Sequence, residues 1–257
     1  MNLDLTTDAH VHTSLCLHAT GTMEAYVTHA IDAGLSGICF LEHMEESIVY
    51  PQRTWLTEED FDQYFEEGRR LKEKYADQIN VLLGVEVGFN PEAKNELLKR
   101  LVKRSWDRVG LSYHYISVKN RDNHLNILTR NPDNLAILKS YDISALLTHY
   151  FKTLIGAVEL IPANTLCHLD AGFRHVEGVA LDAEHRELIE QLLETVKNHS
   201  MSLEINTSGI RNRGIPYPEE SIIRLALSHG IPLVAGSDAH RPEDVGRDFD
   251  RLEALLS

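Results

Sequence analysis

The 257-residue sequence predicts an α/β fold in which a mostly parallel sheet closes into a barrel. Seven short apolar runs alternate with longer segments of helical periodicity, which is typical of parallel strands joined by crossover helices. Histidines and acids follow these runs, and parallel barrels carry their chemistry at the carboxyl ends of their strands. We therefore expect an α/β barrel whose polar side chains gather at one mouth.

Each element is justified in chain order by its pattern. The predicted strands are Leu5–Val11, Gly37–Leu41, Val81–Glu86, Arg108–Ser112, Thr165–Leu169, Ser202–Ile205 and Pro232–Ala235. Helices are predicted after Thr57, where acids open an apolar stripe, and over Ile143–Ile161, where apolar residues recur at helical spacing. Apolar positions at 188–196 and 222–225 continue the helical pattern. The polar, poorly periodic segment Lys119–Asn134 predicts a long loop over the mouth.

Two sequence motifs place pairs of polar side chains on the first and last strands. His10 and His12 are two residues apart, as are Asp238 and His240. Because alternate residues of a strand point the same way, each pair can bind one ion from its strand end. Imidazole and carboxylate are ligands of zinc, manganese and iron. The two motifs therefore predict a metal site.

Five more candidate ligands lie at or just after the ends of predicted strands. His18 lies in the loop after the first strand, and Glu86 is an isolated acid that ends an apolar run. A buried carboxylate without a partner is costly, so Glu86 is expected to have cationic partners. The nine predicted metal ligands are His10, His12, His18, His43, Glu86, His114, His168, Asp238 and His240.

Composition limits the class of protein. The length and the 43% hydrophobic content suit a single domain over residues 1–257. A net charge of -14 argues against nucleic acid as a partner, whereas bound metals would still allow an anionic substrate. Cys16, Cys39 and Cys167 form no CxxC pair and are expected to be reduced thiols. No signal region or membrane span is apparent, so we expect a cytoplasmic protein without a membrane partner.

Four motifs along the chain resemble those of the polymerase-and-histidinol-phosphatase (PHP) superfamily, and most closely its histidinol-phosphate phosphatases. They are Asp8-Ala-His-Val-His-Thr-Ser-Leu-Cys-Leu-His-Ala19, Leu83-Gly-Val-Glu86, Glu204-Ile-Asn-Thr-Ser-Gly-Ile-Arg211 and Gly236-Ser-Asp-Ala-His-Arg-Pro-Glu-Asp-Val-Gly246. The resemblance covers nearly the whole chain. It implies a distorted (β/α)7, TIM-like barrel with two to three divalent ions.

The resemblance also implies how the ligands divide among the metals. One metal would be held by His10, His12, Glu86 and Asp238. Glu86 would bridge to a second metal, held also by His114 and His168, and the third would be held by His18, His43 and His240. The fourth-strand motif departs from the family, because Leu-Ser-Tyr-His114 replaces a sequence like Gly-Ser-Val-His and places Tyr113 beside a ligand.

The function that this implies is hydrolysis of a small phosphorylated metabolite, foremost L-histidinol phosphate in histidine biosynthesis. A hydroxide held between metals would attack the phosphate in line, with the metals neutralising the oxygens. We assign catalytic roles to Glu86, Asp238 and His240. The general acid is left open between His240 and Asp8, which is equally suited to orient a ligand.

Several substrate contacts are also expected. Arg211, after the sixth strand, is the first candidate for the phosphate, and Arg174 is the second. The substrate amine needs an acidic or polar partner, for which Glu42, Glu45 and Glu46 are available.

Two other functions remain open at this stage. A PHP phosphodiesterase, exonuclease or phosphatase for another small ester would use the same metals. A non-catalytic metal- or ligand-binding barrel is the alternative from a different class. It would be expected to lack some ligands, yet all nine positions are filled.

Overall fold

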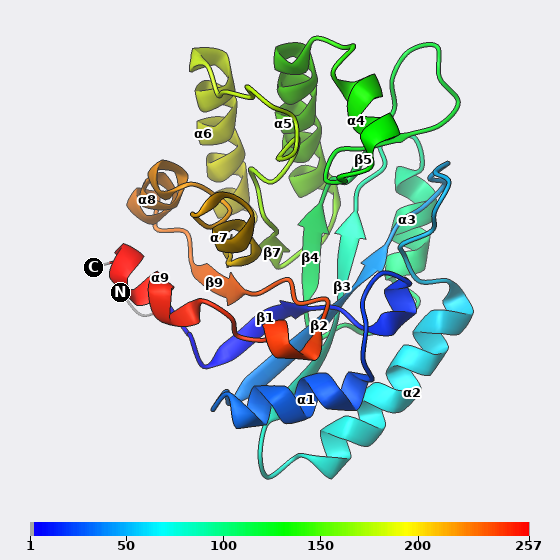
Figure 1. Cartoon of the computed structure of the whole chain (residues 1–257), viewed down its shortest axis with the longest axis vertical. Coiled ribbons are helices and arrows are strands. Elements are labelled where there is room, and N and C mark those ends of the chain that lie inside the picture. The colour runs from blue at the N-terminus through cyan, green and yellow to red at the C-terminus, as the bar shows by residue number, and fades with distance from the viewer. Residues whose placement is uncertain (1–2, 257) are drawn as a thin grey trace.

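Seven parallel strands form the central sheet of the computed structural model, which describes residues 3–256 (Figure 1). Their spatial order is β1-β2-β3-β4-β7-β8-β9, so neighbours in the sheet follow one another around the barrel. The strands are β1 (Thr7–Val11), β2 (Gly37–Met44), β3 (Asn80–Gly88), β4 (Val109–Ser112), β7 (Thr165–Leu166), β8 (Ser202–Asn206) and β9 (Leu233–Gly236). The extreme ends of the domain predicted over residues 1–257 lie outside the described residues.

The first and last strands nearly close this sheet into a ring. Val11 and Ala239 form an isolated parallel bridge just beyond β9. The amide of His12 donates to the carbonyl of Ala239 at 2.9 Å, and the amide of Asp238 donates to the carbonyl of His10 at 2.8 Å. The distorted seven-stranded barrel expected from the sequence is therefore confirmed, and the motifs from both ends of the chain meet at its seam.

All seven predicted strands are present; β1 and β4 end at the predicted residues, whereas the carboxyl ends of the other five differ from the prediction. β2 continues past its apolar run through Glu42 and His43, and β3 continues two residues beyond Glu86, which was predicted to end it. The fifth predicted strand is shorter, because β7 ends at Leu166 and His168 adopts a positive φ of 26°. At these strand ends, buried polar side chains stand where the apolar residues that predict a strand would be expected.

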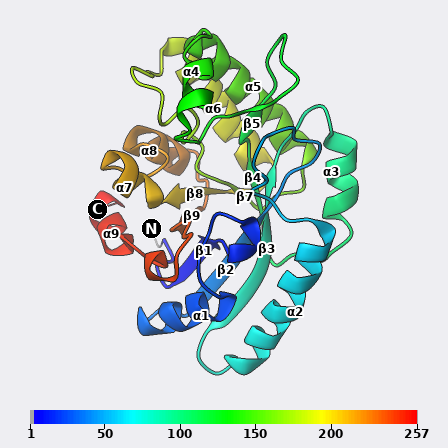
Figure 2. The same cartoon turned by 45° about the vertical axis from the view of Figure 1, so that its right-hand side comes forward.

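Helices surround the sheet. Figures 1 and 2 show α1 and α2 on one side of it and α5 and α6 on the other. The helices are α1 (Met23–Asp32), α2 (Glu58–Lys74), α3 (Lys94–Leu101), α4 (Pro132–Leu138), α5 (Ile143–Leu160), α6 (Ala183–Asn198), α7 (Ser208–Arg213), α8 (Glu220–Ser228) and α9 (Phe249–Leu256). The predicted start of α2 is confirmed by a capping box between Thr57 and Asp60. No helix in the described part of the chain is long and apolar enough to cross a membrane.

The segment expected to be a long loop is partly ordered. Strand β6 (Leu125–Asn126) pairs antiparallel with β5 (Tyr115–Ile116), and α4 begins at Pro132. The prediction of an irregular loop over 119–134 is wrong at these positions. The side chain of Asn134 donates to the carbonyl of Asn126 at 2.7 Å and holds α4 against β6. The segment nevertheless lies over the mouth, as expected, because its residues line the pocket there.

Candidate metal centre and active site

Glu86 lies at the centre of a cluster of histidines from four strand ends. Its Oε1 is 2.7 Å from Nε2 of His168 and 3.2 Å from Nε2 of His114. Its Oε2 is 2.9 Å from Nδ1 of His43 and 3.6 Å from Nε2 of His10. Because the two oxygens face different histidines, this carboxylate is placed to bridge two ions.

The strand-end pairs predicted from the first and last motifs come together beside Glu86. The Nε2 atoms of His10 and His12 are 2.9 Å apart. Nε2 of His12 is 3.2 Å from Oδ1 of Asp238. The near-closure of the barrel produces this contact, because these residues lie in the first and last motifs of the chain.

His18, His43 and His240 complete the cluster on the side of the mouth. The ring of His12 stacks on that of His43 at 4.1 Å between centroids, and the rings of His18 and His240 are 4.4 Å apart. Ligand atoms of His12, His43 and His240 all lie within 4.8 Å of one another, as do those of Cys16, His18 and His240. The structure thus brings all nine predicted ligands into one continuous cluster.

The donor atoms of this cluster fit divalent metal ions. Nδ1 of His12, Oε2 of Glu86 and Nε2 of His240 are buried and make no hydrogen bond to the described residues. Unsatisfied buried polar atoms are rare in folded proteins, and a bound ion is a common explanation. Seven imidazoles with two carboxylates form a donor set that suits zinc, iron or manganese.

The charge states of the cluster also suit metal binding. Burial, together with His43 and His240, holds the pKa of His12 well below its usual range. Burial and the same two neighbours lower the pKa of His18 to about 3. Burial alone would raise the pKa of Glu86, but His114, His10 and His43 hold it well below its usual range. His12 and His18 are therefore neutral and Glu86 is ionised, which are the forms that coordinate metals. By contrast, Glu86 and Glu45 raise the pKa of His114 to about 10 despite its burial, and Glu204 and Glu86 hold the pKa of His10 well above its usual range, so a metal bound by these two imidazoles displaces a proton from each.

A second layer of acceptors orients the histidines. Nδ1 of His10 donates to Oε1 of Glu204 at 2.7 Å, and the other oxygen of Glu204 accepts the amide of His168 at 2.8 Å. Nδ1 of His114 donates to Glu45 at 2.8 Å. When Nδ1 carries the proton, Nε2 is left free to bind a metal. Sequence reasoning assigned no such role to Glu204, although, like Glu86, it is an acid within an apolar strand.

The acids expected to receive a substrate amine are engaged elsewhere, so that expectation is corrected. Glu42 is fully buried and accepts the amide of Thr13 at 2.6 Å, and burial raises its pKa to about 8. Glu45 accepts from His114, and Glu46 lies 3.3 Å from Arg100. Among the described residues, none of these three acids lines the pocket at the mouth.

Asp8 lies behind the cluster and does not reach the pocket. It accepts the amides of Ser237 at 2.9 Å and Gly246 at 2.8 Å, and it is fully buried. Burial raises the pKa of Asp8 to about 6. Of the two roles left open for Asp8, this geometry supports orienting the backbone that carries Asp238 rather than proton donation to a substrate.

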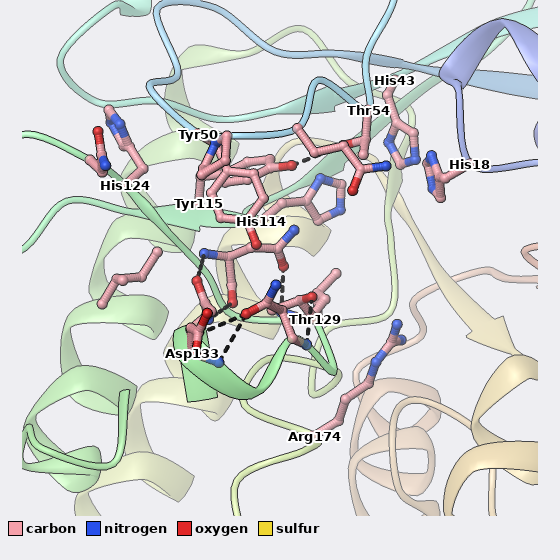
Figure 3. Close-up of a pocket in the computed structure, with 18 of the residues that line it drawn as sticks. His18, His43, Tyr50, Thr54, His114, Tyr115, His124, Thr129, Asp133 and Arg174 are labelled. Carbon is pink, nitrogen blue, oxygen red and sulfur yellow. Dashed lines mark hydrogen bonds between the residues drawn. The ribbon is translucent and has the colours of Figure 1, made fainter. Parts of the chain in front are cut away.

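A pocket of about 600 Å³ opens from the cluster toward the segments that follow β2 and β4. Its lining includes the side chains of His18, His43, His114 and His168, and across from them that of Arg174, which extends toward the histidines (Figure 3). Arg211 is instead paired with Asp244 at 2.6 Å and does not line the pocket. The structure therefore brings the second arginine candidate to the site and leaves the first outside it.

Tyr113 leaves the position of its neighbour His114 intact. Its hydroxyl is 3.3 Å from Nε2 of His149, and its ring stacks on that of Tyr150 at 5.8 Å. The Tyr113 side chain is buried and lies outside the pocket lining. The departure from the family motif thus alters packing behind the strand rather than the metal centre.

Comparison with protein families identifies the barrel. The model of the PHP domain matches residues 8–208, and that of the PHP-associated region matches residues 218–249. The chain belongs to the PHP family. The resemblance predicted from the strand-end motifs is therefore confirmed.

Relatives of this PHP protein match along most of their length. A protein of Deinococcus radiodurans named as a probable histidinol-phosphatase is 34% identical over 94% of this chain and 89% of its own. The histidinol-phosphatase of Bacillus subtilis is 26% identical over 95% of this chain and 96% of its own.

Two crystal structures confirm the PHP fold of the chain. A putative histidinol phosphatase from Listeria monocytogenes superposes with a TM-score of 0.83 at 22% identity, covering 95% of this chain and 99% of that one. The histidinol phosphate phosphatase of Lactococcus lactis, solved with zinc, L-histidinol and phosphate, superposes with a TM-score of 0.79 at 20% identity. That match covers 97% of this chain and 92% of the other.

Proposed function

We propose that this PHP protein is a metal-dependent phosphatase that hydrolyses L-histidinol phosphate to L-histidinol and phosphate, a step of histidine biosynthesis. The observation that carries the proposal is a cluster of nine histidine and acidic side chains, of the kinds that bind metals, that opens into a pocket of small-molecule size. The names of the matched relatives support the choice of substrate.

Two to three divalent ions are part of the proposal. His10, His12, Glu86 and Asp238 would hold the first, Glu86, His114 and His168 the second, and His18, His43 and His240 the third. Zinc is supported by the Lactococcus lactis structure, and manganese and iron have the same ligand preferences. When bound, such ions polarise phosphate oxygens and lower the pKa of bound water.

The chain's own residues would position the phosphate. Arg174 lines the pocket, and its Nε is buried without a partner among the described residues. A guanidinium can bind two phosphate oxygens at once, so Arg174 is assigned to the phosphate. Arg211 would need to leave Asp244 to take that role.

Other pocket residues would hold the rest of the substrate. Besides the metal-binding Glu86 and Asp238, Asp133 is the acid that lines the described pocket, and it makes no ion pair there. We assign it to the substrate ammonium in place of the buried Glu42 and Glu45. Of the two candidates for the general acid, His240 lines the pocket and Asp8 does not.

The proposal includes a cytoplasmic location and no nucleic-acid partner. Cys16, Cys39 and Cys167 are all buried and unpaired, which is typical of proteins in reducing compartments. The net charge of -14 does not favour binding to a phosphate backbone.

The deciding experiment measures phosphate release from L-histidinol phosphate by the metal-loaded protein, beside other monoesters and a bis-ester. Strong preference for L-histidinol phosphate is expected. Activity on the bis-ester alone would instead assign the chain to the phosphodiesterases. A His10→Ala variant that folds but turns over no substrate is the control against a binding-only barrel. Full activity in that variant would overturn the mechanism.

A further inference from the structure

His124 lies at the far end of the pocket from the metal centre. It directly precedes β6, and only 7% of its surface is exposed. Figure 3 shows His124 on one side of the pocket, with His18 and His43 on the opposite side. A substrate whose phosphate lies at the metal centre would therefore extend its other end toward His124.

Two hydrogen bonds to one residue fix the orientation of His124. Its amide donates to the carbonyl of Val49 at 2.9 Å. The amide of Val49 in turn donates to Nδ1 of His124 at 3.1 Å. A backbone N–H can only donate, so Nδ1 must be the unprotonated acceptor of a neutral imidazole. The proton of the ring is therefore on Nε2.

This Nε2–H group is a donor without an acceptor. It is buried and makes no hydrogen bond within the described residues. Nearly all buried donors in folded proteins are paired, and leaving one unpaired is unfavourable. Because the other edge of the ring is bound to Val49, Nε2 is the polar atom of the ring that is left to donate. Neighbouring side chains cover this atom, so a substrate ring that reaches it must displace them.

The chemistry of L-histidinol phosphate leaves one acceptor for this donor. Its phosphate and ester oxygens belong at the metal centre, and its ammonium group can only donate. The remaining acceptor is the unprotonated ring nitrogen of its imidazole, at the end farthest from the phosphorus. We propose that His124 is a specificity-determining residue whose Nε2–H donates to this nitrogen. The inference rests on the proposed function and deepens it.

The surroundings of His124 suit a flat ring. Tyr50 and Tyr115 line the same pocket and contact each other edge to face at 5.2 Å between centroids. The hydroxyl of Tyr115 lies 2.9 Å from that of Thr54, which holds the hydroxyl end of the side chain in place. Aromatic walls with one well-placed polar group are typical of small-molecule subsites.

Two substitutions separate the proposed donor from the contact with Val49. His124→Asn keeps an acceptor where Nδ1 lies and removes the donor at Nε2. His124→Gln loses the acceptor toward Val49 and keeps a donor where Nε2 lies. For each metal-loaded variant, kcat/KM is measured on L-histidinol phosphate and on p-nitrophenyl phosphate, which carries no imidazole. Inhibition by L-histidinol and by inorganic phosphate is measured in parallel.

The expected result is a loss of discrimination in His124→Asn. The ratio of its kcat/KM on L-histidinol phosphate to its kcat/KM on p-nitrophenyl phosphate should fall about 3- to 10-fold, because KM for L-histidinol phosphate rises. Inhibition by L-histidinol should weaken by a matching factor relative to inhibition by phosphate. His124→Gln should keep more of both. If wild-type protein hydrolyses L-histidinol phosphate but the Asn variant keeps its ratio, or the Gln variant loses more, the His124 assignment is wrong. If wild-type protein does not hydrolyse L-histidinol phosphate, both the proposed function and this inference are overturned.

Discussion

At the scale of single residues, the chemistry of the side chains and their place at strand ends predicted the nine residues that gather at the mouth of the barrel. A pair of histidines at alternate positions, or an isolated glutamate in an apolar strand, is costly unless the side chains share a partner. Glu204 was not assigned because its role depends on which residues its two oxygens face, and a folded barrel decides that. For the same reason, the sequence did not show that Arg174 rather than Arg211 lines the pocket: Asp244, 33 residues from Arg211 in the sequence, binds it.

We infer that Glu204 is a positioning residue, because it contacts two of the proposed ligands, His10 and His168, which are assigned to different metals. One oxygen accepts Nδ1 of His10 and the other accepts the amide of His168. In Glu204→Gln, one of these acceptors becomes an NH₂ donor, so one contact turns repulsive. We predict that metal affinity falls about 10- to 100-fold, with loss of more than one ion per chain, measured by equilibrium dialysis and metal analysis.

The matched control for Glu204 is Glu45→Gln, which alters an acceptor of His114 alone. It should weaken binding of a single ion. Circular dichroism would establish that both variants are folded. Unchanged metal content in Glu204→Gln would reject its positioning role.

Arg174 and Arg211 can be separated by their kinetics. A charge-assisted hydrogen bond to a buried group contributes about 1.5–3 kcal/mol, so Arg174→Ala should lower kcat/KM roughly 10- to 100-fold and weaken inhibition by phosphate. Arg211→Ala should have a small effect, because Asp244 keeps its contact with Arg247. A larger loss in Arg211→Ala would show that Arg211 moves into the pocket to bind the phosphate.

At the scale of elements, periodicity found every strand of the central sheet but not where most of them end. β2 continues through Glu42 and His43, because both side chains find partners inside the barrel mouth instead of water: His43 faces Glu86, and Glu42 accepts the amide of Thr13. β5 and β6 have only two residues each, which is too short for any alternation to be recognised. Their pairing depends on the contacts of the pocket that they enclose.

The packing of β9 against β8 and β1 predicts a sharp difference between two glycines. A Cβ at Gly236 would lie 2.7 Å from Cβ of His10 and would contact the carboxylate of Glu204. A Cβ at Gly156, within α5, would meet no atom within 4 Å. We predict that Gly236→Ala lowers both metal content and stability, whereas Gly156→Ala stabilises the fold by about 0.5–1 kcal/mol.

Denaturant unfolding with metal analysis tests both substitutions. The two variants add the same methyl group, so any difference between them reports the space around each site. If Gly236→Ala retained its full metal content, the close approach of β9 to Glu204 would have no part in forming the site.

At the scale of the whole molecule, metal binding and folding are linked. The cluster takes ligands from β1, β2, β3 and the residues after β4, β7 and β9, and an unfolded chain cannot gather them. A ligand that binds only the folded state stabilises it by about 2.7 kcal/mol at a free concentration 100 times its Kd. At about 2–4 °C per kcal/mol for a chain of this size, metal loading should raise Tm by about 5–10 °C.

Calorimetry of metal-free and zinc-loaded protein measures this shift. A His10→Ala, His12→Ala double variant should show a smaller increase because it lacks two ligands of the centre. Equal Tm values for loaded and metal-free wild-type protein would contradict the link between the ions and the fold.

The seam between β1 and β9 has a consequence for the order of events during synthesis. Asp8 and Ser237, which are hydrogen bonded across it, are 229 residues apart in the chain. A polypeptide still emerging from the ribosome holds the first ligands long before the last exist, so the centre can assemble only after translation has passed the final strand. Fragments and unfinished chains should therefore be inactive. The arrangement delays reactive metal chemistry until a complete enzyme surrounds it.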